Sequence, residues 1–243
     1  MLLKDFPAHV VSKFDIHKIE PWSEHFVSLE PAYLEELRNA ADKAGVTFAN
    51  VAADGVDSPY SEKADEQERA SHFYKRWINV GVGIGSPSVR TNIPPANRAK
   101  PDAGSLAERM KPIAEYAAAR NIVVHLENDN PVSENPFFLA ELLDRVNSPW
   151  LRALPDFGNS LAALPAEEVY GGLDQMFARS YGISHVKNRI TEDGKTVAVD
   201  VARVFALAAK HNYKGYFSME WDTEGDVYTG TTSLIAATLK NIS

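Results

Sequence analysis

The feature that most constrains this chain is a regular alternation between two kinds of segment along its length. One kind repeats its apolar residues at helical spacing, as at Leu106, Met110, Ile113 and Ala117. The other is a short apolar run rich in β-branched residues, and seven such runs are predicted to be strands: Ile16–Glu20, Val46–Ala52, Trp77–Val82, Asn121–Glu127, Trp150–Asp156, Gly182–Lys187 and Gly215–Glu220. Alternating strands and helices predict a parallel α/β fold.

The size of the chain suits one domain of this kind. Its 243 residues are 44% hydrophobic, and no Pro/Ser-rich linker divides them, so a single domain over residues 1–243 is predicted. That length fits a (β/α)8 TIM-type barrel. The longest irregular stretches, at 54–64, 91–104 and 188–197, all follow predicted strands, which is the face where a barrel binds its substrate.

Composition excludes several classes of protein. The chain has no cysteine, which excludes disulfides, thiolate zinc sites and cysteine nucleophiles. Its formal net charge of −8 argues against nucleic-acid binding, which needs a basic face. No run reaches the roughly 18 apolar residues of a membrane span, and the first residues lack the apolar stretch of a secretory signal. We therefore expect a cytoplasmic protein that binds neither membranes nor nucleic acid.

Residues suited to metal binding stand at the ends of the last four predicted strands. They are Glu127, Asp156, His185 and Glu220, spaced by 29, 29 and 35 residues, about one βα unit each. Adjacent strands of a parallel barrel would bring all four to one mouth. Any one strand-end acid could instead cap a helix or face solvent, but four in phase favour a common site. Three carboxylates and one imidazole suit Mn²⁺ or Mg²⁺, with Zn²⁺ or Co²⁺ as alternatives.

Several motifs resemble the sugar phosphate isomerase/epimerase family, the xylose isomerase-like TIM barrels. The strings are HLEND (125–129), LPDFGNS (154–160), SHVKN (184–188) and YFSMEWD (216–222). Upstream, DFPAHVVSKFDIHKIEPWSEHF (5–26) is similar to the family's first helix and second strand, and GSPSVRTN (85–92) to its strand ending in Arg-x-Asn. The resemblance covers most of the chain.

The resemblance implies one divalent metal ion, with manganese as first choice, held by Glu127, Asp156, His185 and Glu220. It also implies that Glu127 and Glu220 act as acid and base. In this reading a sugar proton is transferred through a metal-bound enediolate, and the place to which the proton returns decides between epimerisation and isomerisation. The expected partner is a small sugar or sugar derivative, and a homo-oligomer is compatible with the sequence.

Candidate substrate contacts lie near the same strand ends. His125 lies two residues before Glu127 and so points to the same side of an extended strand. Asn159 stands where many relatives have a sugar-contacting histidine. The full set of expected contacts is His125, Asn159, Lys187, Arg189 and Arg90, and Arg98 and Lys100 join Arg90 as candidate phosphate ligands.

The beginning of the chain departs from the family pattern. Relatives usually start with a strand before the helix that here begins near Phe6, and seven strands are counted instead of eight. The predicted fold is thus a (β/α)8-type barrel that lacks its first strand. We expect an exposed or specially covered edge between the first and last strands.

Three other functions remain open at this point. The nearest is a sugar or polyol dehydratase, in which the same enediolate expels a β-hydroxyl. An apurinic endonuclease uses a related barrel with three zinc ions, which needs more histidines than these strand ends offer. A non-catalytic sugar-binding relative is the third.

Overall fold

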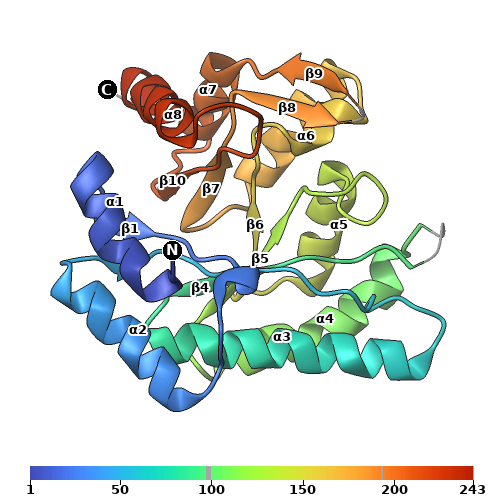
Figure 1. Cartoon of the computed structure of the whole chain (residues 1–243). Helices are drawn as coiled ribbons and strands as arrows, with labels where there is room; N and C mark the ends of the chain where they lie inside the picture. Colours follow the sequence, from blue (N-terminus) through green and yellow to red (C-terminus); the bar gives the residue numbers. More distant parts are fainter. Residues whose placement is uncertain (97–99, 193, 243) are drawn as a thin grey trace.

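Parallel strands surrounded by helices form the structure, a computed structural model that describes residues 1–96, 100–192 and 194–242 (Figure 1). The parallel strands are β1 (Lys18–Ile19), β2 (Thr47–Phe48), β3 (Ala52–Ala53), β4 (Ser88–Thr91), β5 (Val123–Glu127), β6 (Leu151–Leu154), β7 (Ile183–Val186) and β10 (Tyr216–Met219). The helices are α1 (Phe6–Phe14), α2 (Pro31–Lys43), α3 (Ala64–Ile84), α4 (Ala103–Ala118), α5 (Pro136–Val146), α6 (Ala166–Phe177), α7 (Val201–Lys210) and α8 (Val227–Ile242).

The strand order is that of a TIM-type barrel. Strands β3, β4, β5 and β6 form one parallel sheet, while β1 pairs with β2 and β7 pairs with β10. Single bridges between Trp22 and Ala52 and between Asp156 and His185 connect these groups. Because β2 and β3 are separated only by residues 49–51, they occupy one position in the wall. The predicted TIM barrel fold is confirmed, with seven strand positions among the described residues.

One predicted strand is wrong. Residues 77–82 belong to helix α3, and the strand is β4 in the following Ser-Pro-Ser-Val-Arg-Thr stretch. The β-branched run was misleading, whereas the burial pattern is helical: Ala70, Tyr74, Trp77, Gly81 and Ile84 are buried at steps of three and four. Helix α3 therefore packs one face on the barrel.

The stretch 188–197, expected to be irregular, contains an antiparallel hairpin. Strand β8 (Arg189–Glu192) pairs with β9 (Lys195–Ala198), and Figure 1 shows this hairpin projecting from the end of the barrel beside α6. The hairpin places Arg189 on a separate two-stranded unit instead of on the barrel wall.

The expected seam between the first and last strands is present in the described part of the chain. There β1 pairs with β2 and β10 with β7, and no pairing joins β1 to β10. A cavity of about 450 Å³ lies between these two edges. Side chains cover the seam: Lys18 packs over the ring of Tyr216, and Phe14 of α1 stacks on Tyr228 of α8.

No helix within the described ranges is both long enough and apolar enough to cross a membrane.

Helix α3 lies close to the sheet at Gly81. A Cβ atom there would be 2.7 Å from side-chain atoms of both Ile122 and Val89. We expect Gly81→Ala to lower the free energy of unfolding by about 1–3 kcal/mol, because overpacking outweighs the better helix propensity of alanine. Urea unfolding would measure this loss. Val82→Ala, at a half-exposed position of the same helix, should change stability by less than about 0.5 kcal/mol. A Gly81→Ala protein as stable as the wild type would contradict the packing described.

Candidate metal centre

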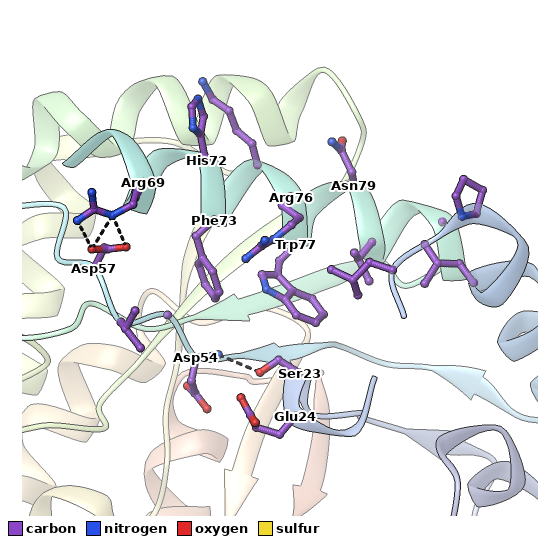
Figure 2. Close-up of a pocket in the computed structure, with 18 of the residues that line it drawn as sticks. Ser23, Glu24, Asp54, Asp57, Arg69, His72, Phe73, Arg76, Trp77 and Asn79 are labelled. Atoms are coloured by element: carbon purple, nitrogen blue, oxygen red, sulfur yellow. Dashed lines mark hydrogen bonds and ion pairs between the residues drawn. The ribbon is translucent and has the colours of Figure 1, made fainter. Parts of the chain in front are cut away.

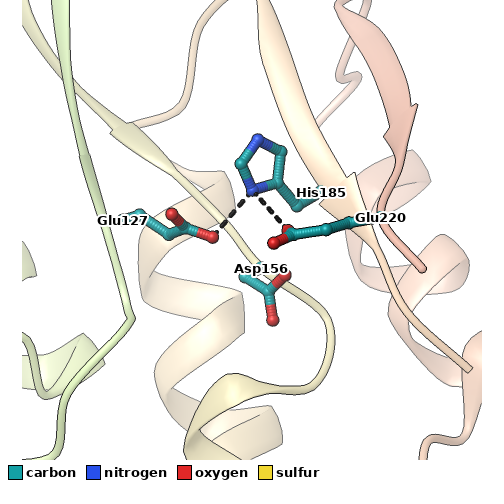
Figure 3. A group of neighbouring side chains, drawn as sticks. All are labelled: Glu127, Asp156, His185 and Glu220. Atoms are coloured by element: carbon teal, nitrogen blue, oxygen red, sulfur yellow. Dashed lines mark hydrogen bonds and ion pairs between the residues drawn. The ribbon is translucent and has the colours of Figure 1, made fainter. Parts of the chain in front are cut away.

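Four predicted ligand residues meet at one end of the barrel wall. Glu127 ends β5, Asp156 lies two residues after β6, His185 is in β7, and Glu220 directly follows β10. One donor atom from each lies within 4.8 Å of the others (Figure 3). Because all four stand at the carboxyl ends of parallel strands, the barrel brings them to the same place.

Asp156 presents one oxygen to this cluster because the backbone holds the other. Its Oδ1 accepts hydrogen bonds from the N–H groups of Gly158, at 2.8 Å, and Asn159, at 2.7 Å. Its Oδ2 is buried and accepts no hydrogen bond from the described residues, and its one ion pair there, with Lys187 Nζ, is long at 3.7 Å. Burial raises the pKa of Asp156 to about 7, although the nearby Lys187 ammonium opposes the shift. A buried carboxylate oxygen without a donor is costly, and a cation would satisfy it.

The His185 ring lies against carboxylates on both of its nitrogens. Its Nδ1 is 2.7 Å from Glu127 Oε1 and 3.0 Å from Glu220 Oε2, while its Nε2 is 3.0 Å from both oxygens of Glu20. Burial alone would lower the pKa of His185, but Glu127, Glu20 and Glu220 outweigh it and raise the pKa well above 6.5. A proton therefore occupies a position that a metal ion can take.

The donor set fits a divalent cation. Three carboxylates and one imidazole converge, Asp156 Oδ2 accepts no hydrogen bond from the described residues, and the histidine nitrogen facing the cluster lies against oxygens of Glu127 and Glu220. Hard oxygen ligands with a single nitrogen suit Mn²⁺ or Mg²⁺, and Co²⁺ or Zn²⁺ are compatible. Glu127, Asp156, His185 and Glu220 could hold one such ion.

Two cations balance the acidic cluster. Arg90 Nε lies 2.9 Å from Glu127 Oε2, and the same guanidinium is bound to Asp54. Lys187 Nζ is 2.8 Å from Asp222 Oδ2 and 3.5 Å from Glu220 Oε1. Both side chains line a cavity of about 540 Å³ at the mouth of the barrel. Their charges are already paired, so they position and neutralise carboxylates.

Asn159, which was expected to be a sugar contact, hydrogen-bonds to a residue of the cluster. Its Oδ1 accepts a hydrogen bond from Lys187 Nζ at 2.5 Å, and its Nδ2 donates to Glu127 Oε1 at 3.3 Å. Asn159 therefore links a candidate acid or base to the lysine, from a position where a bound molecule would touch all three.

Other predicted contacts lie elsewhere. His125 points into the barrel interior below the cavity, where burial lowers its pKa to about 4 and Nδ1 lies 3.4 Å from Asn50 Oδ1. Arg189 is on the β8–β9 hairpin and packs over the Trp221 ring, 4.5 Å from its centroid. Neither lines the cavity. The expected phosphate role of Arg90 does not fit its pairing with two carboxylates.

The remaining phosphate candidates do not extend the site either. Lys100 is exposed and is absent from the described lining of the cavity. Arg98 lies outside the described residues.

Sequence reasoning missed other acidic residues of the cavity: Glu20, Asp54, Asp129 and Asp222. The signal for Glu20 was present, because it ends the first predicted strand just as the metal-ligand candidates end theirs. Asp129 and Asp54 lie on the loops that follow strands β5 and β3. Burial and the charge of Glu127 raise the pKa of Asp129 to about 6.

A larger hollow than this cavity, about 1240 Å³, lies at a different place (Figure 2). It lies along α2 and α3 on the outside of the barrel, lined by Phe73 and Trp77 and by Arg69, which is bound to Asp57. It contains none of the four clustered donors. Asp54 lines both this hollow and the cavity at the barrel mouth.

Known proteins resemble the chain in sequence and in fold. A family model described as xylose isomerase-like TIM barrel matches residues 9–240. The 3'-dehydrocarminate deglycosidase alpha subunit of a Microbacterium species is 24% identical over 181 residues, covering 70% of this chain and 49% of that protein. The chain thus spans about half the length of this curated relative.

Solved structures share the fold at low sequence identity. D-psicose 3-epimerase with D-tagatose, from Clostridium cellulolyticum H10, superposes with a TM-score of 0.74 at 14% identity, covering 94% of this chain and 83% of that one. A xylose isomerase-like TIM barrel protein from Mycobacterium smegmatis in complex with magnesium gives 0.73 at 16% identity, covering 99% and 89%.

We expect one divalent ion per chain to bind with release of protons. A ligand must be deprotonated, and the pKa values of Asp156, about 7, and of His185, raised well above 6.5, mean that the metal-free cluster carries protons near neutral pH. The apparent Mn²⁺ affinity should therefore fall by about tenfold per pH unit below pH 7 for each proton displaced. Calorimetry in two buffers of different ionisation enthalpy would count these protons. Affinity that is constant from pH 6 to 8, without proton release, would contradict the electrostatics described.

Proposed function

The chain belongs to the xylose isomerase-like TIM barrel family, and from its clustered donors we propose that it is a divalent-metal-dependent isomerase or epimerase of a small sugar or sugar derivative. The observation that supports this most is the convergence of Glu127, Asp156, His185 and Glu220, the first three of them buried, beside a cavity of about 540 Å³. Four such donors beside a cavity suit proton transfer next to a carbonyl group.

The two glutamates are placed to exchange a proton with a molecule between them. Figure 3 shows Glu127 and Glu220 reaching the cluster from opposite sides, with His185 and Asp156 between them. A carboxylate on each side of a sugar carbon can remove a proton from one face and return one to the other. When bound, the metal ion would hold the sugar oxygens and stabilise the negative charge that develops as the proton leaves.

Glu220 is suited to remove the proton. Burial would raise its pKa, but His185 and Lys187 outweigh burial and hold the pKa below its usual value, so the carboxylate stays ionised. Glu127 is restrained on the other side by Arg90, at 2.9 Å from Oε2, and by Asn159, at 3.3 Å from Oε1. These contacts fix the orientation of its carboxylate while a substrate is bound.

The point of proton return determines the product. Return to the opposite face of the same carbon gives the epimer, whereas return to the neighbouring carbon of the enediolate interconverts aldose and ketose. The solved neighbours named as D-psicose 3-epimerase and D-tagatose 3-epimerase-like protein support the epimerase alternative. We place the reaction in the cytoplasm.

A second candidate reaction is elimination, supported by the Microbacterium relative, which is named as a deglycosidase of a dehydro compound. The first step is the same removal of a proton beside a ketone. If a group on the next carbon then leaves with its electron pair, the products are an enone and the released group. A dehydratase would release water in this way, and a deglycosidase would release the group attached to the sugar. That relative is named as an alpha subunit, which adds a partner subunit to the proposal. The proposal also includes the homo-oligomer with which the sequence is compatible.

We expect the Mn²⁺-loaded protein to exchange a carbon-bound proton of a ketose in D₂O. Glu127→Gln and Glu220→Gln should each lower this rate by about 10²–10⁴-fold, because a positioned acid or base contributes that much. Mass spectrometry of the recovered sugar would measure the exchange. The matched control is Glu115→Gln, the same change at an exposed position of α4, which should react as the wild type does. Failure to exchange any ketose of a broad panel, or full activity of both site variants, would count against catalysis.

The two reactions differ in their products. With a panel of free ketoses and of keto-glycosides, an isomerase or epimerase yields a deuterated sugar of unchanged elemental composition apart from the label. An eliminating enzyme yields an enone, which absorbs in the ultraviolet, together with the released group or water. Release from keto-glycosides without epimerisation of free ketoses would favour the second candidate.

A further inference from the structure

Glu20 contacts the metal centre from outside the set of four clustered donors. It directly follows β1, and its side chain is only 8% exposed. Both of its carboxylate oxygens lie 3.0 Å from His185 Nε2, the ring nitrogen that points away from Glu127 and Glu220. A buried carboxylate in this place is costly unless its oxygens are used.

The surroundings hold the Glu20 carboxylate in one orientation. Asn50 Nδ2 donates a hydrogen bond to Glu20 Oε1 at 2.7 Å, and Ser218 lines the same cavity as Glu20. Asn50 lies between β2 and β3, His185 is in β7, and Ser218 is in β10. Through these hydrogen bonds Glu20 links β1 to two other positions of the wall, that of β2 and β3 and that of β7.

The two nitrogens of the His185 ring have different roles. A neutral imidazole carries its proton on one nitrogen and a lone pair on the other. Nδ1 faces Glu127 Oε1 at 2.7 Å, inside the cluster, so a metal ion there needs the lone pair on Nδ1. The proton must then be on Nε2, where Glu20 accepts it.

We propose that Glu20 is a positioning residue that fixes the Nε2–H tautomer and the ring orientation of His185, so that Nδ1 is available to a divalent cation. The role rests on the proposed metal site, and it adds to that site a residue from outside the four clustered donors. Carboxylates that orient a metal-binding histidine in this way contribute about 10–100-fold to metal affinity. The seam lies beside the first strand position, so this same side chain also ties the unpaired edge to the metal centre.

Mn²⁺ binding to Glu20→Gln tests the proposal. Glutamine keeps the size and one acceptor oxygen but removes the charge, so we expect the dissociation constant to rise by about 10–100-fold. Calorimetry would compare it with the wild type and with Glu115→Gln, which removes one charge at an exposed site and should bind Mn²⁺ unchanged. Circular dichroism and the thermal midpoint would show that the variant is folded. A folded Glu20→Gln protein that binds Mn²⁺ as tightly as the wild type overturns the proposal.

A measurement on the wild type keeps the test independent of the variant's folding. Nitrogen-15 NMR of the Mg²⁺-loaded protein reports which nitrogen of His185 carries the proton. The expected result is a proton on Nε2 that exchanges slowly with water, and a proton on Nδ1 overturns the proposal. The two ideas fail differently: a wild type that binds no divalent ion contradicts the proposed function, whereas a wild type that binds it with the other tautomer contradicts only the role of Glu20.

Discussion

The structure depends on keeping several negative charges together in a buried place. Three carboxylates and one histidine offer donor atoms within 4.8 Å of one another, and Glu20 adds a further buried carboxylate behind the histidine. Charges of one sign at this distance repel strongly in a poorly hydrated interior. A parallel barrel can hold them because each comes from the end of a separate strand, and the strands themselves are fixed by backbone hydrogen bonds and a continuous apolar core.

Positively charged side chains next to the acids reduce this repulsion, and further carboxylates hold those side chains in place. Arg90 and Lys187 stand beside the acids, and each is itself anchored by an outer carboxylate, Asp54 for the arginine and Asp222 for the lysine. This pairing restrains long side chains that would otherwise be mobile, and it leaves the cluster with a deficit of positive charge. A divalent cation is the species of suitable size and charge to remove that deficit.

The four clustered residues were predictable from the sequence because the strands of a parallel barrel all end at the same face. Acids and a histidine that recur once per βα unit, each at the end of a strand, are therefore expected to lie close together. The same logic predicted Asn159 and Lys187 as sugar contacts, and both line the cavity at the barrel mouth. The strand prediction failed at residues 77–82. Their apolar, β-branched residues are typical of a strand, but in the structure they belong to helix α3 and are buried at helical spacing. Arg189 and His125, which were also predicted as contacts, are not in the described lining of this cavity: Arg189 is on the β8–β9 hairpin, and His125 is fully buried in β5.

The short turn after β6 has a consequence for how this site could change during evolution. The N–H group of Asn159 holds Asp156, while its side chain contacts Lys187 and Glu127. A substitution of Asn159 keeps the hydrogen bond from its backbone N–H to Asp156. It removes the side-chain hydrogen bonds to Lys187 and Glu127 at the same time. In the proposed enzyme, position 159 is therefore a place where the polar lining of the cavity can change in one step while the backbone hydrogen bonds to Asp156 are kept.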